Sequence, residues 1–109
     1  MKISSDAIIP EEKLTRYLLV PKPQDDKSKF LAQAGFTQDN PADLLSAIRQ
    51  LTELVEAVKD GSNEYGIFYR VEGDLQGVNE RNLAVVTIWL RWHLDGKFRF
   101  VTLKPKRES

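Results

Sequence analysis

The sequence predicts an α+β fold in which two to three N-terminal helices pack on one face of a small antiparallel sheet of three to four strands. Apolar residues recur at helical spacing in the first half of the chain, and from Asn63 onward they recur at every second position. Short turn signals separate the alternating segments of the second half, and such short turns join strands that are antiparallel neighbours in a sheet. A length of 109 residues fits one domain. We therefore expect a single domain over residues 1–109, with a helical half at 1–61, a sheet at 62–105 and a tail at 106–109.

Two short helices are expected first. Pro10 suits the first position of a helix, acidic residues follow it, and this helix must end before Pro21. The second helix covers about residues 26–34, and Gly35 stands where a left-handed residue commonly closes a helix.

The third helix has the clearest pattern. Asn40 is typical of an N-cap and Pro41 of a first helical residue. Apolar residues then follow one helical stripe as far as Val58. Gly61 is the expected end of this helix.

The strands follow from alternation. The first alternates around Tyr69, and Gly73 and Gly77 are expected to bracket a turn-rich connection after it. The second strand has two alternating sets of residues, and we assign one of them to the core. This set contains Ala84, Val86, Ile88, Leu90, Trp92 and Leu94. After the turn signal Asp95-Gly96, strict alternation continues from residue 97 to residue 104.

The register of the last hairpin decides which side chains share a face. A two-residue loop would place Arg91 opposite Phe100 and bring charge into the core. A three-residue loop, with Gly96 in the left-handed conformation, pairs Trp92 with Phe98. Because a slip of one residue exchanges the faces of a whole strand, burial favours the second register.

This register leaves a second sheet face that combines aromatic rings, four fixed cations and the one histidine. Its members are Phe68, Arg70, Thr87, Trp89, Arg91, His93, Lys97 and Arg99. Aromatic rings can stack bases, cations can hold phosphates, and an imidazole can move a proton near neutral pH. The alternative is an ordinary solvated face whose cations discourage edge pairing. Two single positions also stay open: His93 is a general base or an ordinary hairpin-end residue, and Trp89 stacks a base or packs beneath a terminus or a partner.

The net charge of zero hides an asymmetry. Residues 1–65 carry 8 basic and 11 acidic side chains, whereas residues 66–109 carry 8 and 5. A polyanionic partner should therefore meet the sheet.

The absence of cysteine excludes disulfides, thiolate zinc sites, iron–sulfur clusters and cysteine nucleophiles, and a single histidine excludes a multi-histidine metal site. We expect no metal site and no cofactor. No stretch resembles a signal sequence or reaches the roughly 20 apolar residues that span a bilayer. We expect a cytoplasmic protein without a membrane partner.

Glycine, aromatic and apolar residues follow a distinctive order in the second half of the chain: Tyr65-Gly66-x-Phe68-Tyr69-x-Val71-x-Gly73-x-Leu75-x-Gly77-x-Asn79-x-Arg81, then Thr87-x-Trp89 and Arg99-Phe100-Val101-Thr102-Leu103-x-Pro105. Matching positions in the first half are Pro10-Glu11-Glu12-Lys13-Leu14, Tyr17-Leu18-Leu19, Lys27, Phe30-Leu31 and Gly35-Phe36. This order resembles an uncharacterised bacterial domain family found as small stand-alone proteins and at the C-termini of polymorphic and phage-head-associated toxins.

The resemblance implies a fold similar to barnase, colicin and RelE-type ribonucleases. It also implies functional candidates at Lys27, Arg81, Thr87, Trp89, Arg99 and Thr102. The sequence departs from the family's usual Gly-Pro-Asn-Gly-Arg run at residues 77–81, where it retains the arginine, Arg81.

Two hypotheses follow. The first is a toxin-like, metal-independent ribonuclease of a toxin-antitoxin or polymorphic toxin system, in which arginines hold the phosphate and His93, or a Tyr or Lys in its place, activates the ribose 2′-hydroxyl. Its catalytic candidates are His93, Arg81, Arg99 and Thr102, and the candidates for binding RNA or a partner are Lys27, Phe68, Arg70, Thr87, Trp89, Arg91 and Lys97. The second is a non-catalytic protein that uses the same face to bind a cognate antitoxin or another small acidic protein. The site assignment of the first hypothesis requires Arg81, Arg91, His93 and Arg99 to converge in one concavity.

Overall fold

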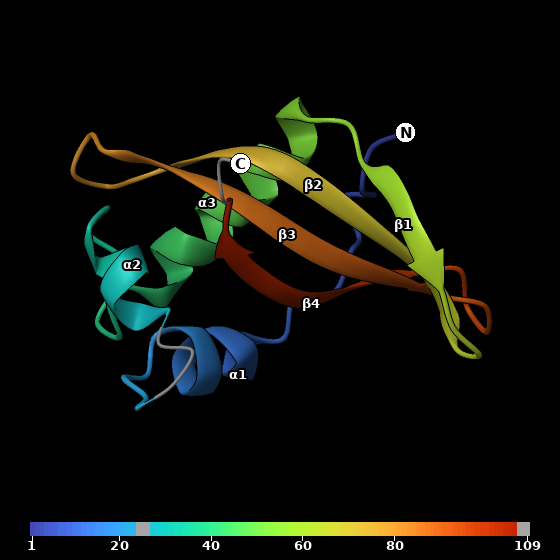
Figure 1. Ribbon diagram of the computed structural model, residues 1–109, viewed down its shortest axis with the longest axis horizontal. Helices are drawn as coiled ribbons and strands as arrows, with labels where there is room; N and C mark the ends of the chain where they lie inside the picture. The colour runs from blue at the N-terminus through green and yellow to red at the C-terminus, as the bar shows by residue number, and fades with distance from the viewer. Residues whose placement is uncertain (24–26, 107–109) are drawn as a thin grey trace.

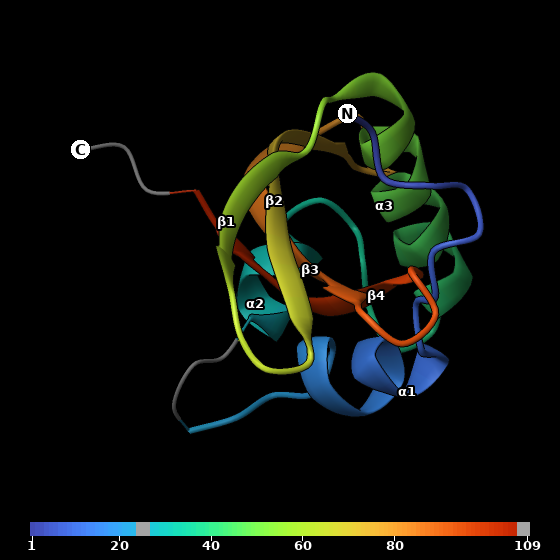
Figure 2. The ribbon, with the colours of Figure 1, turned by 90° about the vertical axis from the view of Figure 1, so that its right-hand side faces the viewer.

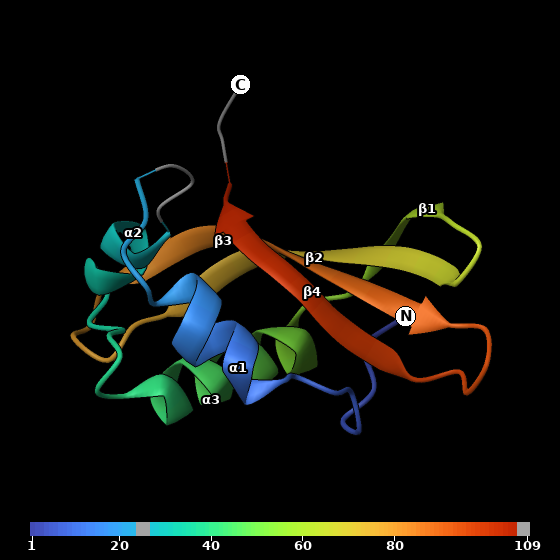
Figure 3. The same cartoon turned by 90° about the horizontal axis from the view of Figure 1, so that it is seen from below.

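In residues 1–23 and 27–106, which the computed structural model describes, three α-helices and one π-helical turn pack with a four-stranded antiparallel sheet of order β1-β2-β3-β4. This confirms the predicted α+β class. The elements are α1 (Glu11–Lys13), the π-helical turn η1 (Leu14–Leu18), α2 (Ser28–Ala32), α3 (Pro41–Leu54), β1 (Val58–Ser62), β2 (Gly66–Gln76), β3 (Asn82–Trp92) and β4 (Phe98–Pro105). Figures 1 and 3 show α1 and α3 on one side of the sheet, which leaves the other side of its central strands open.

The helix signals are confirmed at both ends of the helical region. Pro10 precedes α1, and Gly35 after α2 has a φ of 87°. Asn40 and Pro41 begin α3 as expected. The apolar stripe of α3 includes Leu44, which is fully buried, and the helix contacts β2.

The expected extent of the third helix is wrong. It ends at Leu54, where Val55 turns to extended backbone with φ −118° and ψ 135°. Val58 begins β1, pairs with Arg70 and is 51% exposed. Hydrogen bonds to β2 satisfy the backbone N–H and C=O groups of β1, and β-branched residues such as Val58 favour strands. The apparent helical stripe is therefore interrupted after α3.

The expected connection between Gly73 and Gly77 is also wrong, because β2 continues to Gln76. Gly73 lies within the strand and pairs with Val85. A Cβ at Gly73 would lie 2.9 Å from Leu51 Cδ1 of α3, so the glycine permits the close approach of helix and strand. The turn itself is formed by residues 77–81.

The two faces of β3 are exchanged relative to the prediction. Val85, Thr87 and Trp89 are fully buried beneath the helices, whereas Ile88 and Leu90 face the open side and are half-buried. Both sets are apolar because β3 is a central strand, so alternation alone does not distinguish them. Of the polar residues that marked the outer face in the sequence, Thr87 is buried, and Arg91 and His93 lie where β3 ends.

The predicted hairpin pairing of Trp92 with Phe98 is wrong by one residue near the turn. The structure pairs Arg91 with Phe98 and Trp89 with Phe100, and a four-residue loop, with Gly96 left-handed at φ 68°, connects the strands. The left-handed glycine is therefore confirmed, but the loop is one residue longer.

A β-bulge at Val101 then interrupts the alternation of β4. Trp89 pairs with Phe100 but Ile88 pairs with Thr102, so Val101 is an extra residue on β4. Beyond it, Leu103 is fully buried and Thr102 faces the open side, the reverse of the strict alternation predicted for this strand.

The view along the strands in Figure 2 shows α3 on the right of β2 and β1 on its left. Among the described residues, no helix is long and apolar enough to cross a membrane.

Candidate functional site

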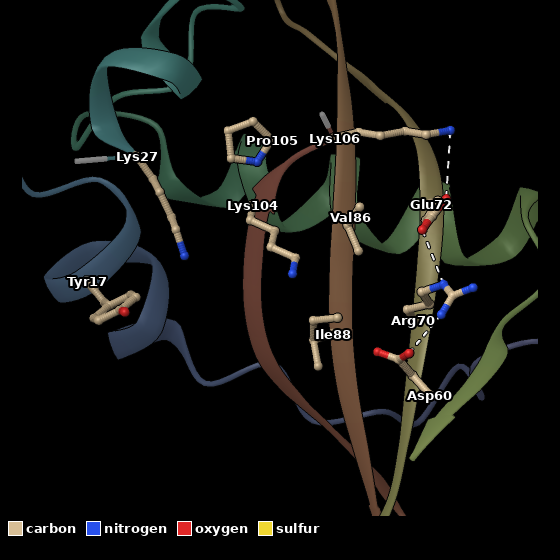
Figure 4. A pocket seen from close by; sticks show the side chains of 10 residues that line it. All are labelled: Tyr17, Lys27, Asp60, Arg70, Glu72, Val86, Ile88, Lys104, Pro105 and Lys106. Atoms are coloured by element: carbon tan, nitrogen blue, oxygen red, sulfur yellow. Dashed lines mark hydrogen bonds and ion pairs between the residues drawn. The ribbon is translucent and has the colours of Figure 1, made fainter. Parts of the chain in front are cut away.

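A hollow of about 960 Å³ lies on the open face of the sheet, and we call it the trough. Figure 4 shows its side chains, which come from η1, the residue before α2, all four strands and the segment after β4. They are Tyr17, Lys27, Asp60, Arg70, Glu72, Val86, Ile88, Lys104, Pro105 and Lys106. Four cations and two carboxylates therefore surround an apolar floor.

The strand register explains how these side chains meet. Glu72 pairs with Val86, which pairs with Lys104, so these residues form one row across β2, β3 and β4. Its outer members are separated by two strand spacings, about 10 Å between their Cα atoms. Arg70 and Ile88 begin the neighbouring row in the same way. Because paired residues in a sheet point to the same face, each row presents its side chains together.

One wall of the trough is a chain of ion pairs. Arg70 Nη1 lies 2.7 Å from Asp60 Oδ1, and its Nε lies 3.2 Å from Glu72 Oε1. Lys106 Nζ extends the chain at 3.7 Å from Glu72 Oε2 (Figure 4). Asp60 is itself the extra residue of a bulge in β1, between Lys59 and Gly61. The guanidinium of Arg70 thus orients two carboxylates that border the trough.

The opposite wall is formed by α2, η1 and β4. Lys27 Nζ donates a hydrogen bond of 2.9 Å to Thr102 Oγ1, which completes the row of Arg70 and Ile88. Tyr17 stands beside Lys27 at the rim (Figure 4). A second hollow of about 600 Å³, which we call the side hollow, adjoins the trough through Tyr17 and Lys27. It is lined by Glu12, Lys13, Arg16, Tyr17, Lys27, Val101 and Thr102.

The predicted site is divided by this geometry. Lys27, Arg70 and Thr102 lie at the trough or its side hollow. Arg81 lies in the turn before β3 and His93 follows the other end of that strand, which is itself about 33 Å long at the usual rise per residue. The expectation that Arg81, Arg91, His93 and Arg99 converge in one concavity is therefore wrong.

Thr87 and Trp89 belong to the core instead of the open face. Trp89 Nε1 donates to Thr87 Oγ1 at 2.9 Å, and that hydroxyl donates to the Val71 carbonyl. The indole ring meets Phe100 edge to face, with centroids 5.4 Å apart. Trp89 is therefore not exposed for base stacking, and its ring packs in the core against Phe100 instead of beneath a terminus or a partner. Phe68 is on the open face as predicted, opposite Leu90, but outside the trough lining.

A second group of predicted residues gathers at the turn between β3 and β4. This turn end contains Arg91, Trp92, His93, Leu94, Asp95, Lys97 and Arg99. The Arg99 guanidinium lies 3.9 Å from the centre of the Trp92 ring and pairs with Asp95 at 2.9 Å. Hydrogen bonds from the Arg99 side chain and the Lys97 backbone N–H lower the pKa of Asp95 to about 2. Arg91 donates to the Gly96 carbonyl at 3.1 Å and lies over Phe98.

Several trough residues were missed from the sequence. Tyr17, Asp60, Glu72, Lys104 and Lys106 come from segments that no local motif connects. Asp60 and Lys104 occupy their positions through the two bulges, which strict alternation does not reveal. The signal that the sequence does offer is the basic character of residues 104 and 106, which contribute to the positive charge of the second half.

Comparisons with known proteins agree with this architecture. A comparison with curated protein sequences gives no match. A solved structure of a contact-dependent growth inhibition toxin and immunity protein complex from Klebsiella pneumoniae 342 contains a chain of the same fold, with a TM-score of 0.68 and 20% sequence identity, covering 95% of this chain and 97% of that chain. The model of the family described as Domain of unknown function (DUF6883) matches residues 2–107. The chain therefore belongs to the DUF6883 family.

Proposed function

We propose that this domain is a toxin-type endoribonuclease that binds the RNA backbone in the trough and cleaves it without a metal ion. The observation that carries the proposal is the convergence of Lys27, Lys104 and Lys106 from two distant parts of the chain on an open sheet face, in a protein of zero net charge. A concave cationic surface attracts and holds phosphates. The similar fold of a chain in a toxin and immunity protein complex supports a role in a toxin system.

The two walls of the trough suit cleavage by the neighbouring 2′-hydroxyl. In an in-line displacement the attacking and leaving oxygens lie on opposite sides of the phosphorus, so the base and the acid must come from opposite directions. Glu72 stands on the β2 side and Lys27 on the α2 side, with the floor of Val86 and Ile88 between them (Figure 4).

The reaction then proceeds through these groups. Glu72 takes the proton of the 2′-hydroxyl, and the 2′-oxygen forms a bond to phosphorus while the bond from phosphorus to the 5′-oxygen breaks. Lys27 gives a proton to the departing 5′-oxygen, and Lys104 stabilises the extra negative charge at phosphorus. The products are a 2′,3′-cyclic phosphate and a 5′-hydroxyl. Arg70 and Thr102 are positioning residues for Glu72 and Lys27, which they contact directly.

Cleavage assays test this assignment. The purified protein should cut single-stranded RNA in the presence of EDTA and leave cyclic phosphate ends, and a 2′-deoxy substitution at the cleaved position should abolish the cut. Glu72→Gln and Lys104→Gln should each lower the rate by about 100-fold or more. The matched controls are Glu53→Gln on α3 and Lys59→Gln on β1, which are exposed outside the trough and should leave the rate unchanged.

Failure would take two distinct forms. Cleavage that persists in Glu72→Gln and Lys104→Gln would move the active site elsewhere, whereas an absence of RNA cleavage by the unmodified protein would remove the enzyme assignment. Inducible expression in a bacterium gives a second readout. We expect growth arrest and RNA degradation with the unmodified chain and with the control variants, and normal growth with Glu72→Gln.

A second candidate function, binding of a partner protein, is favoured by the turn end. Leu94 is 90% exposed at its apex, and the nearby Tyr65 is 61% exposed, held by a hydrogen bond from the His93 N–H to the Tyr65 carbonyl. Exposed aromatic and aliphatic side chains beside Arg91 and Lys97 have the composition of an interface centre, and the cations fit an acidic partner such as an antitoxin or immunity protein. Co-purification with the product of a neighbouring gene, lost in Leu94→Gln but kept in the control Leu54→Gln, would support it. Retention of the complex in Leu94→Gln would contradict it.

A further inference from the structure

Tyr17 occupies a distinctive position at the rim shared by the trough and the side hollow. It belongs to the π-helical turn η1, whose closing hydrogen bond joins the Leu19 N–H to the Leu14 carbonyl at 3.0 Å. Leu14 and Leu18 anchor this turn in the core, with 1% and 0% exposure, whereas Tyr17 is 47% exposed. Single π-helical turns are rare and frequently occur at functional sites. The turn thus holds an aromatic side chain outward at the edge of the trough.

Two lysine ammoniums lie over this ring. Lys22 Nζ lies 3.4 Å from the ring centroid, and Lys27 Nζ lies 5.7 Å from it. The Lys22 side chain is long and flexible, so it can move from the ring face to a neighbouring phosphate when a base stacks there. The adjoining Lys13 donates to the carbonyl of Val101 at 2.9 Å, which fixes the π-helical turn against the bulge of β4. An aromatic face next to lysines is the combination with which proteins bind single-stranded nucleic acid: the ring stacks a base and the cations hold the phosphates beside it.

We infer that Tyr17 is a base-stacking platform, and that the substrate is RNA with an unpaired nucleotide next to the phosphate bound in the trough. This inference rests on the proposed function, because it assumes that the trough holds the RNA backbone. A strand that continues from the trough into the side hollow passes Tyr17, which lines both. Bases inside a duplex are stacked on their neighbours and have no free face to offer, so a paired substrate gains nothing from the ring.

Binding of a fully 2′-deoxy-substituted single-stranded oligonucleotide, which the proposed reaction cannot cleave, tests the inference. Dissociation constants are measured by fluorescence anisotropy at one salt concentration, for the unmodified protein, Tyr17→Phe, Tyr17→Leu and the control Leu54→Ala, an exposed apolar residue of α3 outside both hollows. We expect Tyr17→Phe and Leu54→Ala to bind within about twofold of the unmodified protein, and Tyr17→Leu to bind about 5- to 150-fold more weakly. Circular dichroism and thermal unfolding confirm that each variant is folded.

A base-paired duplex of the same sequence is the second arm, and here Tyr17→Leu should change the affinity by less than about twofold. Equal binding of the single strand by Tyr17→Leu and the unmodified protein, or no binding by either, would overturn the inference. So would an equal loss in Tyr17→Phe and Tyr17→Leu, which would assign the effect to the hydroxyl. Binding is measured without cleavage, so the two proposals can fail separately. If Tyr17→Leu weakens binding but the unmodified protein cuts no RNA, only the enzyme assignment is wrong. If the protein cuts RNA but Tyr17→Leu binds normally, only the role of Tyr17 in base stacking is wrong.

Discussion

Lys27 and Thr102 are 75 residues apart in sequence, and the Lys27 ammonium donates a 2.9 Å hydrogen bond to the Thr102 hydroxyl. This contact joins the start of α2 to β4 at the border between the trough and the side hollow. Both residues are partly buried, so the hydrogen bond is shielded from solvent on one side. It connects the helical half of the chain to β4 on the wall that lies opposite the ion pairs.

Thr102→Val should therefore destabilise the fold. The substitution removes the acceptor of a charged donor in a partly buried place, and we expect the free energy of unfolding to fall by about 1–2 kcal/mol. Urea denaturation measures this change. The control is Thr15→Val, whose exposed hydroxyl only contacts the Glu11 carbonyl at 3.2 Å and whose loss should change the stability by less than about 0.5 kcal/mol. Equal effects of the two substitutions would mean that the contact with Lys27 contributes nothing.

The two tryptophans should differ sharply in their contribution to stability. Trp89→Phe leaves a void in the core and removes the donor to Thr87, so we expect a loss of about 2–4 kcal/mol. Trp92→Phe affects a half-exposed ring beneath Arg99 and should cost less than about 1 kcal/mol. Denaturant unfolding of both variants provides the comparison. If Trp92→Phe proved the more costly, the assignment of the inner face of β3 would be incorrect.

Gly66 at the start of β2 should not accept a side chain. A Cβ there would lie 2.1 Å from the Arg91 carbonyl oxygen of the neighbouring strand, and a backbone atom in a ladder moves only with its strand. We expect Gly66→Ala to lower the free energy of unfolding by about 2–3 kcal/mol. Gly73→Ala is the matched comparison, because its Cβ would meet only the side chains of Leu51 and Val55, which can shift. In thermal unfolding, the melting temperature of Gly66→Ala should be lower than that of Gly73→Ala. The reverse order would contradict the strand pairing at Arg91.

Asp95 should make the stability of the turn end depend on pH in the acid range. Its folded-state pKa of about 2 lies below the ordinary value of 3.8, so the unfolded chain binds the proton more readily. The stabilisation by the ionised carboxylate is therefore fully present above about pH 4 and is lost as the pH falls toward 2. In Asp95→Asn this contribution is absent at every pH. The stability difference between the two proteins, measured by urea unfolding from pH 2 to pH 7, should shrink on acidification, and a constant difference would exclude the ion pair with Arg99 as its source.

The features that were predictable from sequence are those with a local cause. Pro10, Gly35 and the pair Asn40-Pro41 mark helix boundaries through their own backbone preferences, and the structure confirms each. Gly96 is left-handed for the same reason. The overall class follows from the change of hydrophobic period, which requires no knowledge of long-range contacts.

The faces of the sheet were not predictable in this way. Val85 and Val86 are adjacent and both buried, one beneath the helices and the other in the floor of the trough, so hydrophobicity does not reveal which side the helices occupy. For the same reason, the sequence alone does not show which side chains line the trough. Only the register shows that Glu72 and Lys104 share a row, and only the ion pair shows that Asp60 belongs to the same wall as Arg70.

The extra residue at Val101 divides β4 into two segments under separate constraints. Phe100 and Leu103 both point into the core although they are three residues apart, a spacing that would place them on opposite faces of a regular strand. The bulge at Val101 makes this possible. Thr102 and Lys104 are thereby released to the solvent side. A substitution at Lys104 can consequently alter the trough while Phe100 and Leu103 keep the packing beneath, so loss of function and loss of folding can be separated within this one strand.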